Sequence, residues 1–286
     1  MFVLLALVAA PRADAQDRVR RPARGLRYLR RVLRGASLRT TVHALFVDLC
    51  DPAVELRATA PDEGALTAGQ WAQRVGAAAA INGDYFAIQR FAPLGPARGD
   101  GRWWPAGERE HRDALLVAAR GGRADVIDAP EGAATTLWSD AERTVDPSWT
   151  EVVAVRERIV VRGQVRESPA IEHDGARHPR TAVGFTADRR TLIFAVVEGR
   201  AEDASGATVR ELAVILRGLG AWEAMKLDGG GSSTLFIAGL GTVNRPSDGA
   251  PRVVATHLGV IVRREVPRSA PSRCPARAPS AAAPVR

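Results

Sequence analysis

The sequence predicts a single domain of the α+β class, with β-rich mixed or antiparallel sheets and a few helices. Nine short runs carry β-branched residues, which are typical of strands. Several of these runs alternate apolar and polar side chains, as half-buried strands do. Only two stretches carry clear helix-start signals. Strands that outnumber helices without a regular alternation argue against a parallel βαβ array. The 286 residues also allow two small domains, with a boundary near residues 128–149, although a long loop within one domain fits that segment as well.

The expected strands all lie between two basic flanks. They cover residues 41–49, 53–59, 77–82, 114–119, 124–128, 151–161, 191–197, 234–239 and 254–262. We also expect a strand that begins at Arg180 and another that leads into the glycine-rich stretch after residue 227.

Both expected helices begin at a threonine. Thr67 with Gln70, and Thr208 with Glu211, have the spacing of a capping box, in which two side chains satisfy free amides of the first turn. The second helix has the clearer apolar stripe, which consists of Val209, Leu212, Ala213, Leu216 and Leu219. Gly220 follows at the point where this helix should end.

The positive charge of the chain belongs to its two flanks. Residues 17–39 carry nine Arg against one Asp, and residues 263–286 carry six Arg against one Glu, whereas residues 40–262 have a net charge of −5. Basic flanks of this kind bind polyanions or anionic membrane surfaces weakly. The charge is almost entirely arginine, with Lys226 the single lysine, and it lies outside the core. We therefore expect no specific nucleic-acid partner.

The two flanks give different structural expectations. In residues 17–39, Leu26, Leu29, Val32 and Leu33 could form one stripe of a short amphipathic helix, or the segment could be an extended first strand. From Pro267 onward the chain is rich in Pro, Ala, Ser and Arg and has almost no large apolar residue, which predicts disorder.

The first residues resemble an export signal. Residues 2–10 are apolar, and Ala13-Asp14-Ala15 before Gln16 has the small-x-small pattern of a cleavage site, so we expect an exported protein. The resulting division is residues 1–15 as signal peptide, 16–39 as a basic N-terminal segment, 40–262 as the domain and 263–286 as a disordered tail. Cys50 and Cys274 would form a disulfide if the fold brings them together, and are otherwise free thiols.

The stretch from Asp228 to Thr234 is the strongest candidate for a functional site. Gly229, Gly230 and Gly231 leave the main chain bare, so that a ligand can approach the backbone amides, which suit phosphate or carboxylate oxygens. Asp228 and the hydroxyls of Ser232, Ser233 and Thr234 stand beside them. The plain alternative is a glycine-rich hairpin loop.

Other polar clusters lie near the ends of expected strands. They are Asn82-Gly83-Asp84, Arg180, Glu198-Gly199-Arg200, and a late group of Asn244, Arg245, Ser247, Asp248 and His257. Each has a plain explanation when taken alone, since Asn-Gly is a common hairpin turn and a single arginine is commonly a surface residue.

Several common sites are not supported by these residues. No lysine follows the glycines as in a phosphate-binding loop, and no G-x-G-x-x-G opens a helix. A Gly-x-Ser-x-Gly nucleophile turn is also missing from the glycine stretch. The histidines and cysteines are scattered without ligand spacing, so we expect neither a metal nor a cofactor.

Five segments occur together in an order that resembles the phosphodiester glycosidase domain family. These segments are AINGDYF, RTAVGF, VVEGR, LDGGGSSTL and NRPSDGAPRVVATHLGV, and the resemblance extends over residues 40–262. Three places depart from the family pattern. Glu198 replaces the usual aspartate, residues 152–163 stand where a glycine-rich stretch is common, and His257 stands where an amide is common. The family hydrolyses the bond between a sugar anomeric carbon and a phosphodiester oxygen.

The resemblance implies roles for the polar clusters. Asp228, Glu198 and Asp84 become the candidate catalytic carboxylates. The candidate ligands of the phosphate or sugar are Asn82, Gly83, Arg180, Arg200, Gly229, Gly230, Gly231, Ser232, Ser233, Asn244, Arg245, Ser247, Asp248 and His257. The implied substrate is a phosphorylated carbohydrate of the cell envelope or the extracellular space. The alternative is a non-catalytic domain that binds phosphorylated glycans.

Overall fold

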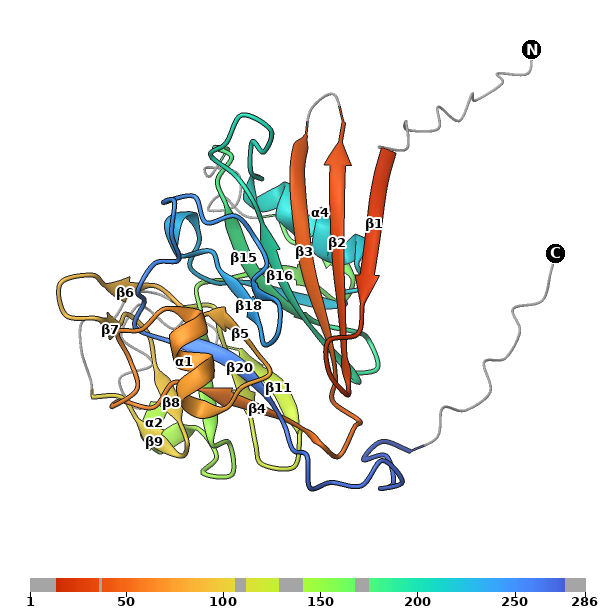
Figure 1. Ribbon diagram of the computed structural model, residues 1–286. Helices are drawn as coiled ribbons and strands as arrows, with labels where there is room; N and C mark the ends of the chain where they lie inside the picture. The colour runs from red at the N-terminus through yellow and green to blue at the C-terminus, as the bar shows by residue number, and fades with distance from the viewer. Residues whose placement is uncertain (1–13, 36–37, 106–111, 129–140, 168–174, 276–286) are drawn as a thin grey trace, which may run out of the picture.

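The computed structural model describes residues 14–35, 38–105, 112–128, 141–167 and 175–275. Its largest element is an eight-stranded antiparallel sheet (Figure 1). In spatial order this sheet consists of β1 (Asp14–Arg20), β2 (Leu26–Arg34), β3 (Arg39–Asp48), β16 (Thr191–Val197), β15 (Arg180–Phe185), β17 (Glu223–Lys226), β13 (Glu157–Val161) and β14 (Gln164–Val165).

Two five-stranded antiparallel sheets and one small hairpin complete the β-structure. One sheet has the order β19 (Gly241–Thr242), β18 (Leu235–Ile237), β5 (Ala79–Asn82), β20 (His257–Val262) and β4 (Val54–Ala58). The other has the order β11 (Ala124–Asp128), β10 (Ala114–Ala118), β12 (Glu151–Val155), β8 (Ala97–Gly99) and β9 (Arg102–Trp103). The hairpin pairs β6 (Phe86–Ala87) with β7 (Ala92–Pro93).

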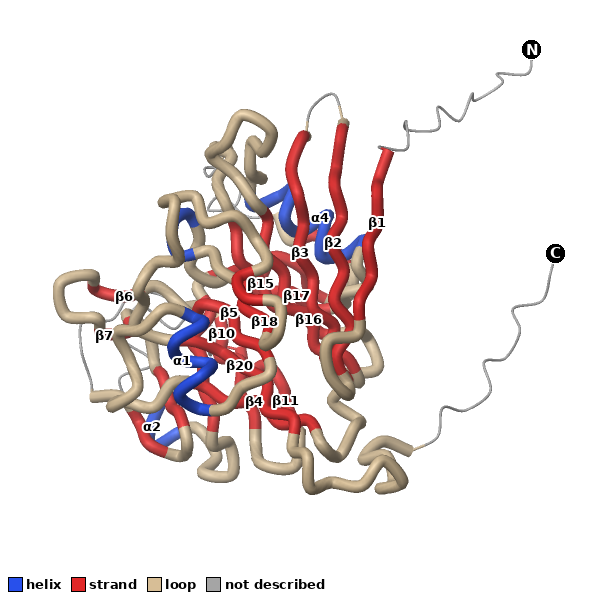
Figure 2. Tube along the Cα trace, in the orientation of Figure 1, coloured by secondary structure: helices blue, strands red, loops and turns tan. Residues whose placement is uncertain are grey.

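Few helices accompany these strands (Figure 2). They are α1 (Ala68–Val75), α2 (Ala141–Thr144), α4 (Val209–Gly218) and the short 3₁₀ helix η2 (Gly230–Ser232). The capping boxes predicted at Thr67 and Thr208 are both present, with each threonine side chain accepting from the third helical amide. No helix among the described residues is both long and apolar enough to cross a membrane.

The eight-stranded sheet has a hydrophobic core on each face. On one face α4 contributes Val209, Leu212 and Leu216, which belong to the same buried cluster as Val42 and Ile193. On the other face a larger core joins the sheet to both five-stranded sheets, and it includes residues of β3, β15, β17, β5, β20 and β10. The α1 helix covers the outer side of β5 and β20 through Trp71. The predicted fold class, a single sheet-rich α+β domain, is therefore confirmed.

The basic segment before residue 40 is a pair of strands. The β1 and β2 strands pair in register, and β2 pairs along its whole length with β3. Leu26 and Tyr28 enter one core while Leu29 enters the other, which is the two-residue period of a strand. The amphipathic-helix alternative was wrong, because the apolar side chains serve two opposite faces of a sheet.

Two other expectations about strands and boundaries need correction. Residues 151–161 form two strands, since the chain passes at Arg156 from β12 in one sheet to β13 in another. The segment 128–149 is no domain boundary, because β10 and β11 before it share a sheet with β12 after it. Residues 129–140 lie outside the described part of the chain.

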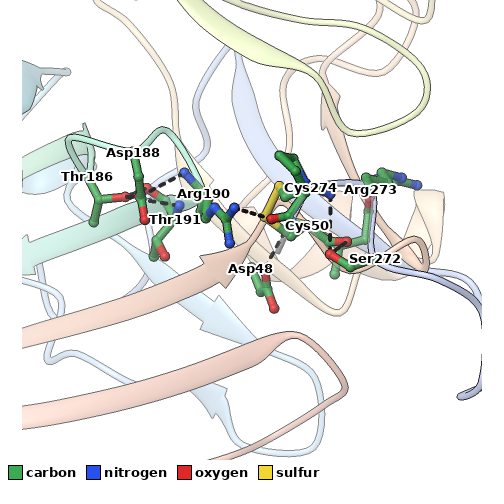
Figure 3. Close-up of a disulfide and its surroundings, with 11 residues drawn as sticks. Asp48, Cys50, Thr186, Asp188, Arg190, Thr191, Ser272, Arg273 and Cys274 are labelled. Carbon is green, nitrogen blue, oxygen red and sulfur yellow. Dashed lines mark hydrogen bonds between the residues drawn. A yellow bond between two sulfur atoms is a disulfide. The ribbon is translucent and has the colours of Figure 1, made fainter. Parts of the chain in front are cut away.

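The start of the C-terminal tail is attached to the domain. Cys50 and Cys274 form a disulfide with 5.1 Å between their Cα atoms, and the amide of Arg273 donates to the carbonyl of Cys50 at 2.9 Å (Figure 3). The expectation of disorder therefore does not hold for residues 267–275. Residues 1–13 and 276–286, which carry most of the predicted signal and the rest of the tail, lie outside the described residues.

Candidate active site

Asn82 joins three elements at the end of β5. Its Nδ2 donates to the carbonyl of Asp228 at 2.8 Å, and its Oδ1 accepts from the hydroxyl of Thr181 at 2.9 Å and from the amide of Thr234 at 3.1 Å. The next residue, Gly83, also accepts from the amide of Asp228 at 3.1 Å. Asn82 and Gly83 therefore hold the glycine-rich stretch against β5 and β15, and the hairpin alternative for this pair does not apply.

The glycine-rich stretch forms a tight turn after β17. Gly230 has a φ of +60°, a backbone conformation that favours glycine. The amide of Gly229 donates to Oδ1 of Asp228 at 2.9 Å, and the amide of Gly230 donates to the carbonyl of Pro179 at 2.8 Å. No described residue accepts from the amide of Gly231. Two of the three glycine amides therefore stabilise the turn itself, and the third glycine, Gly231, is buried against Arg252 and Asp248.

Asp228 and Asp84 are two carboxylates with raised pKa values. Burial is the main cause of the raised pKa of Asp228. Hydrogen bonds from the hydroxyl of Ser232 and the amide of Gly229 lower this pKa in part. Burial also raises the pKa of Asp84 to about 6, although Arg112 opposes it, and the charge of Asp228 raises it further. Nε of Arg112 lies 2.5 Å from Oδ2 of Asp84 in a fully buried ion pair. The two carboxylates are therefore close enough to influence each other's protonation.

Glu198 has the opposite protonation behaviour. Burial alone would raise its pKa, but hydrogen bonds from His43 and from the amide of Arg245 outweigh burial, so that the pKa of Glu198 is lowered. Nε2 of His43 lies 2.9 Å from Oε1 of Glu198, and the Arg245 amide donates to the same oxygen at 2.8 Å. The other nitrogen of His43, Nδ1, lies 2.8 Å from the hydroxyl of Tyr28. Glu198 is thus held as an ionised carboxylate.

Two arginines stand over the glycine turn. The guanidinium of Arg200 lies 3.1 Å from the point that a Cβ of Gly230 would occupy, and no described acidic residue pairs with it. The guanidinium of Arg252 forms an ion pair with Asp248 at 2.5 Å and lies 3.4 Å from the hydroxyl of Ser232. This ion pair fills the space where a side chain at Gly231 would lie. Arg200 is exposed and can bind an anion at the turn.

Two of the predicted ligands are buried and form hydrogen bonds within the protein. Arg180 is buried, and its guanidinium donates to the carbonyls of Ala207 and Ala176 at 2.8 and 2.9 Å. His257 is fully buried, with its ring nitrogens 3.0 Å from the Thr59 hydroxyl and 3.1 Å from a backbone carbonyl. Burial lowers the pKa of His257 to about 3, so that the ring is neutral. It belongs to the core beside α1, because β20 carries it into the sheet interior.

The remaining predicted residues lie around the turn. Asn244 uses its side-chain amide on the backbone of the turn, accepting from the amide of Leu235 at 2.8 Å and donating to the carbonyl of Ser233 at 3.0 Å. The hydroxyls of Ser233 and Ser247 are buried and have no hydrogen-bond partner among the described residues. Arg245 extends its guanidinium to Asp203 at 2.5 Å.

Sequence reasoning missed several residues of this region. Arg252 follows Asp248 by four positions, which is a visible hint of an ion pair. His43 and Tyr28 lie in strands far from the motifs, and nothing in their local sequence indicates that they reach Glu198. Tyr85 is surrounded by three cationic side chains, with Arg156 at 4.9 Å, Lys226 at 5.7 Å and Arg112 at 5.9 Å from its ring.

Comparison with known proteins identifies the family. Residues 75–261 match the model of the phosphodiester glycosidases. The chain belongs to this family. An 84-residue stretch is also 37% identical to YomE, an uncharacterised protein derived from the SPbeta prophage of Bacillus subtilis strain 168, and it covers 29% of this chain but 13% of YomE. The chain thus spans a small part of that relative's length.

Three solved structures share the fold of this chain. The catalytic domain of zebrafish N-acetylglucosamine-1-phosphodiester alpha-N-acetylglucosaminidase, auto-inhibited by its pro-peptide, matches with a TM-score of 0.64 and 19% identity over 90% of this chain and 85% of its own. A hypothetical protein of Synechocystis matches with a TM-score of 0.63 and 17% identity, over 90% of this chain and 64% of its own. A Burkholderia pseudomallei protein described as exported matches with a TM-score of 0.59 and 18% identity, over 78% of this chain and 74% of its own.

Family membership and fold together support a glycosidase function in broad terms. The identities to the solved structures are low, so these similarities establish the shared fold. The described residues contain no group of three or more His, Cys, Asp or Glu side chains that could hold a metal ion.

Proposed function

We propose that this protein is an exported glycosidase that hydrolyses the bond between a sugar anomeric carbon and a phosphodiester oxygen, on envelope or extracellular glycans. The observation that carries the proposal is the pairing of an anion site with a carboxylate at one turn. The exposed guanidinium of Arg200 can hold phosphate oxygens, while Asp228 stands at the start of the same turn.

The expected reaction needs little help for the leaving group. Water adds to the anomeric carbon, the bond from this carbon to the phosphate oxygen breaks, and its electron pair leaves with the phosphate monoester. A carboxylate accepts the proton that the water gives up. Because a phosphate is a weaker base than a sugar alkoxide, charge stabilisation by Arg200 matters more than proton donation.

The carboxylates have the protonation states that this reaction requires. Glu198 is ionised and lies two residues before Arg200, so it can stabilise positive charge on the sugar ring in an oxocarbenium-like transition state. Asp228 has a raised pKa and can exchange a proton with water. Burial and the charge of Asp228 raise the pKa of Asp84, which is held by the buried Arg112.

Export is supported by covalent structure as well as by the first residues. The Cys50–Cys274 disulfide belongs to the class of bonds that persist in oxidising compartments, such as the periplasm and the extracellular space. One solved structure with the same fold is of a protein described as exported.

Release of sugar from a panel of sugar-1-phosphodiesters tests the proposal. The wild type should release sugar, Asp228→Asn should lower the rate by about 100-fold or more, and Arg200→Gln should raise KM by about tenfold. Arg217→Gln is the matched control, because Arg217 is an exposed arginine at the end of α4. If the wild type binds the panel but releases nothing, the chain is a non-catalytic domain that binds phosphorylated glycans.

A further inference from the structure

Two arginines face each other across the first hairpin, and no described acidic residue pairs with either. Arg18 of β1 is the direct register partner of Arg30 of β2. Directly opposite side chains on one face lie about 5 Å apart at their Cβ atoms, where like charges destabilise the pair. Arg20, two residues further along β1, lies on the same face. No described acidic side chain forms a salt bridge with Arg18, Arg20 or Arg30. We name these three arginines the hairpin patch.

On the other face of the same hairpin, an arginine forms an ion pair with an acidic residue. Arg31 is a neighbour of Arg30 in sequence but points to the opposite face, because side chains alternate along a strand. There it donates to both oxygens of Asp17, at 2.8 and 2.6 Å. Among the residues that the structure describes, Arg31 therefore has an acidic partner on one face, and the three arginines of the hairpin patch have none on the other.

The hairpin patch lies in register with the candidate active site. One row across the eight-stranded sheet runs from Arg18 through Arg30, His43 and Val196 to Thr181. His43 in this row contacts Glu198, and Thr181 at its end donates to Asn82. Adjacent strands lie about 4.8 Å apart, so the distance along the row from Arg18 to Thr181 is about 20 Å. The patch and the site share one face of one sheet, with β1 at the sheet edge (Figure 1).

We propose that the hairpin patch binds phosphate groups of a polymeric glycan at positions beyond the bond that is cleaved. This inference rests on the proposed function and names the substrate class as a chain with repeated negative charges. Arg18 lies about 20 Å from Thr181 along the row, which is beyond the reach of a single sugar-1-phosphodiester bound at the site but within the reach of a polymer. Each guanidinium suits a phosphate, because its planar fork donates to two oxygens at once.

The row geometry favours a chain-like anion over a membrane surface. The three cations lie in line with the site, so a polymer that occupies both would lie along the row. Val19, the exposed apolar residue of β1, is 55% exposed but alternates to the face opposite the hairpin patch. The described part of the patch therefore presents charge without a large apolar side chain that could enter a lipid layer.

The test compares Arg30→Gln with Arg31→Gln. Both substitutions remove one positive charge from the same strand, but only Arg30 belongs to the hairpin patch. Binding of a linear polyphosphate of about 20 phosphates is measured at two salt concentrations, together with kcat/KM for a polymeric and a single-unit sugar-1-phosphodiester. Arg30→Gln should weaken polyphosphate binding about fivefold to tenfold and make its salt dependence shallower by about one unit of slope. Selectivity for the polymer should fall by a similar factor.

Several results would overturn the proposal. Equal losses in Arg30→Gln and Arg31→Gln would mean that only net charge matters. An unchanged Arg18→Gln/Arg30→Gln double variant would mean that the patch binds nothing. Loss of binding to anionic vesicles with intact polyphosphate binding would assign the patch to a membrane. Thermal unfolding of each variant verifies folding. Because polyphosphate binding requires no turnover, failure of the proposed hydrolysis is recognised separately, as a wild type that releases no sugar.

Discussion

His43 holds Glu198 through a hydrogen bond of 2.9 Å between Nε2 and Oε1. An ionised carboxylate only accepts hydrogen bonds, so Nε2 is the donor. The hydroxyl of Tyr28, 2.8 Å from Nδ1, orients the ring from behind, and burial raises the pKa of this tyrosine to about 12, so that it keeps its proton. Three strands, β2, β3 and β16, thus cooperate to fix one carboxylate beside the glycine turn.

Replacement of His43 should move the acid limb of the pH–activity profile. The pKa of Glu198 is lowered in the folded protein, so its ionisation stabilises the fold above the pKa of an unfolded glutamate, and this stability is lost as pH falls through the lowered pKa. His43→Gln removes the strongest favourable contact and should shift the acid limb to higher pH. Tyr28→Phe should shift it less, in the same direction. Profiles that superimpose on the wild type would show that His43 does not control Glu198.

Asp84 should make stability fall as pH rises through the weakly acidic range. Its pKa in the fold is about 6, above that of an unfolded aspartate. The stability that its protonated form contributes is therefore complete below about pH 4 and is lost as pH rises to about 6, a change of roughly 3 kcal/mol. Asp84→Asn should remove this slope, and above about pH 6 it should also lower stability because it breaks the buried ion pair between Asp84 and Arg112. Urea unfolding at pH 4, 5, 6 and 7 measures both effects, and an unchanged slope in the variant would contradict the assignment.

A methyl group at Gly231 should disturb the ion pair over the turn. Its Cβ would lie 1.9 Å from a guanidinium nitrogen of Arg252 and 2.1 Å from a carboxylate oxygen of Asp248, so both side chains must move. Gly231→Ala should therefore lower kcat/KM by about tenfold or more, in line with the effect of misplaced binding groups. Gly218→Ala is the control, since its Cβ meets no atom within 4 Å, and it should raise stability by up to about 1 kcal/mol. Activity of Gly231→Ala equal to that of the control would exclude a role for this ion pair.

Loss of the disulfide should destabilise the domain without changing the active site. Cys50 and Cys274 are 224 residues apart in sequence, so the bond closes a very long loop in the unfolded chain. Cys274→Ser should lower the free energy of unfolding by about 2 to 5 kcal/mol. Thermal unfolding with and without a reducing agent measures this effect. A wild type whose Tm is unchanged by full reduction would show that the bond contributes little.

Local signals in the sequence predicted much of this structure. The capping boxes at Thr67 and Thr208, the turn at residues 229–231 and the strand alternation are short-range patterns, and the structure contains all of them. Asn82 stands at the end of a predicted strand, and it contacts the glycine turn through the carbonyl of Asp228.

Long-range packing explains what the sequence could not show. The role of a backbone amide depends on its partner, and Pro179, the partner of the Gly230 amide, lies 51 residues earlier. His257 looked like a ligand because it lies in a polar motif, but its strand carries it against Trp71, with ring centroids 5.1 Å apart. His43 lies 155 residues from Glu198, so no spacing rule connects them.

Hydrolysis in water enriched with oxygen-18 tests the central claim most directly, because it shows which bond breaks. If the enzyme cleaves the bond between the anomeric carbon and the phosphodiester oxygen, the phosphate monoester released from a sugar-1-phosphodiester keeps its original oxygens. Mass spectrometry should then detect no oxygen-18 in that product, and Asp228→Asn should release about 100-fold less of it. Oxygen-18 in the phosphate would instead mean attack at phosphorus and would contradict a glycosidase mechanism.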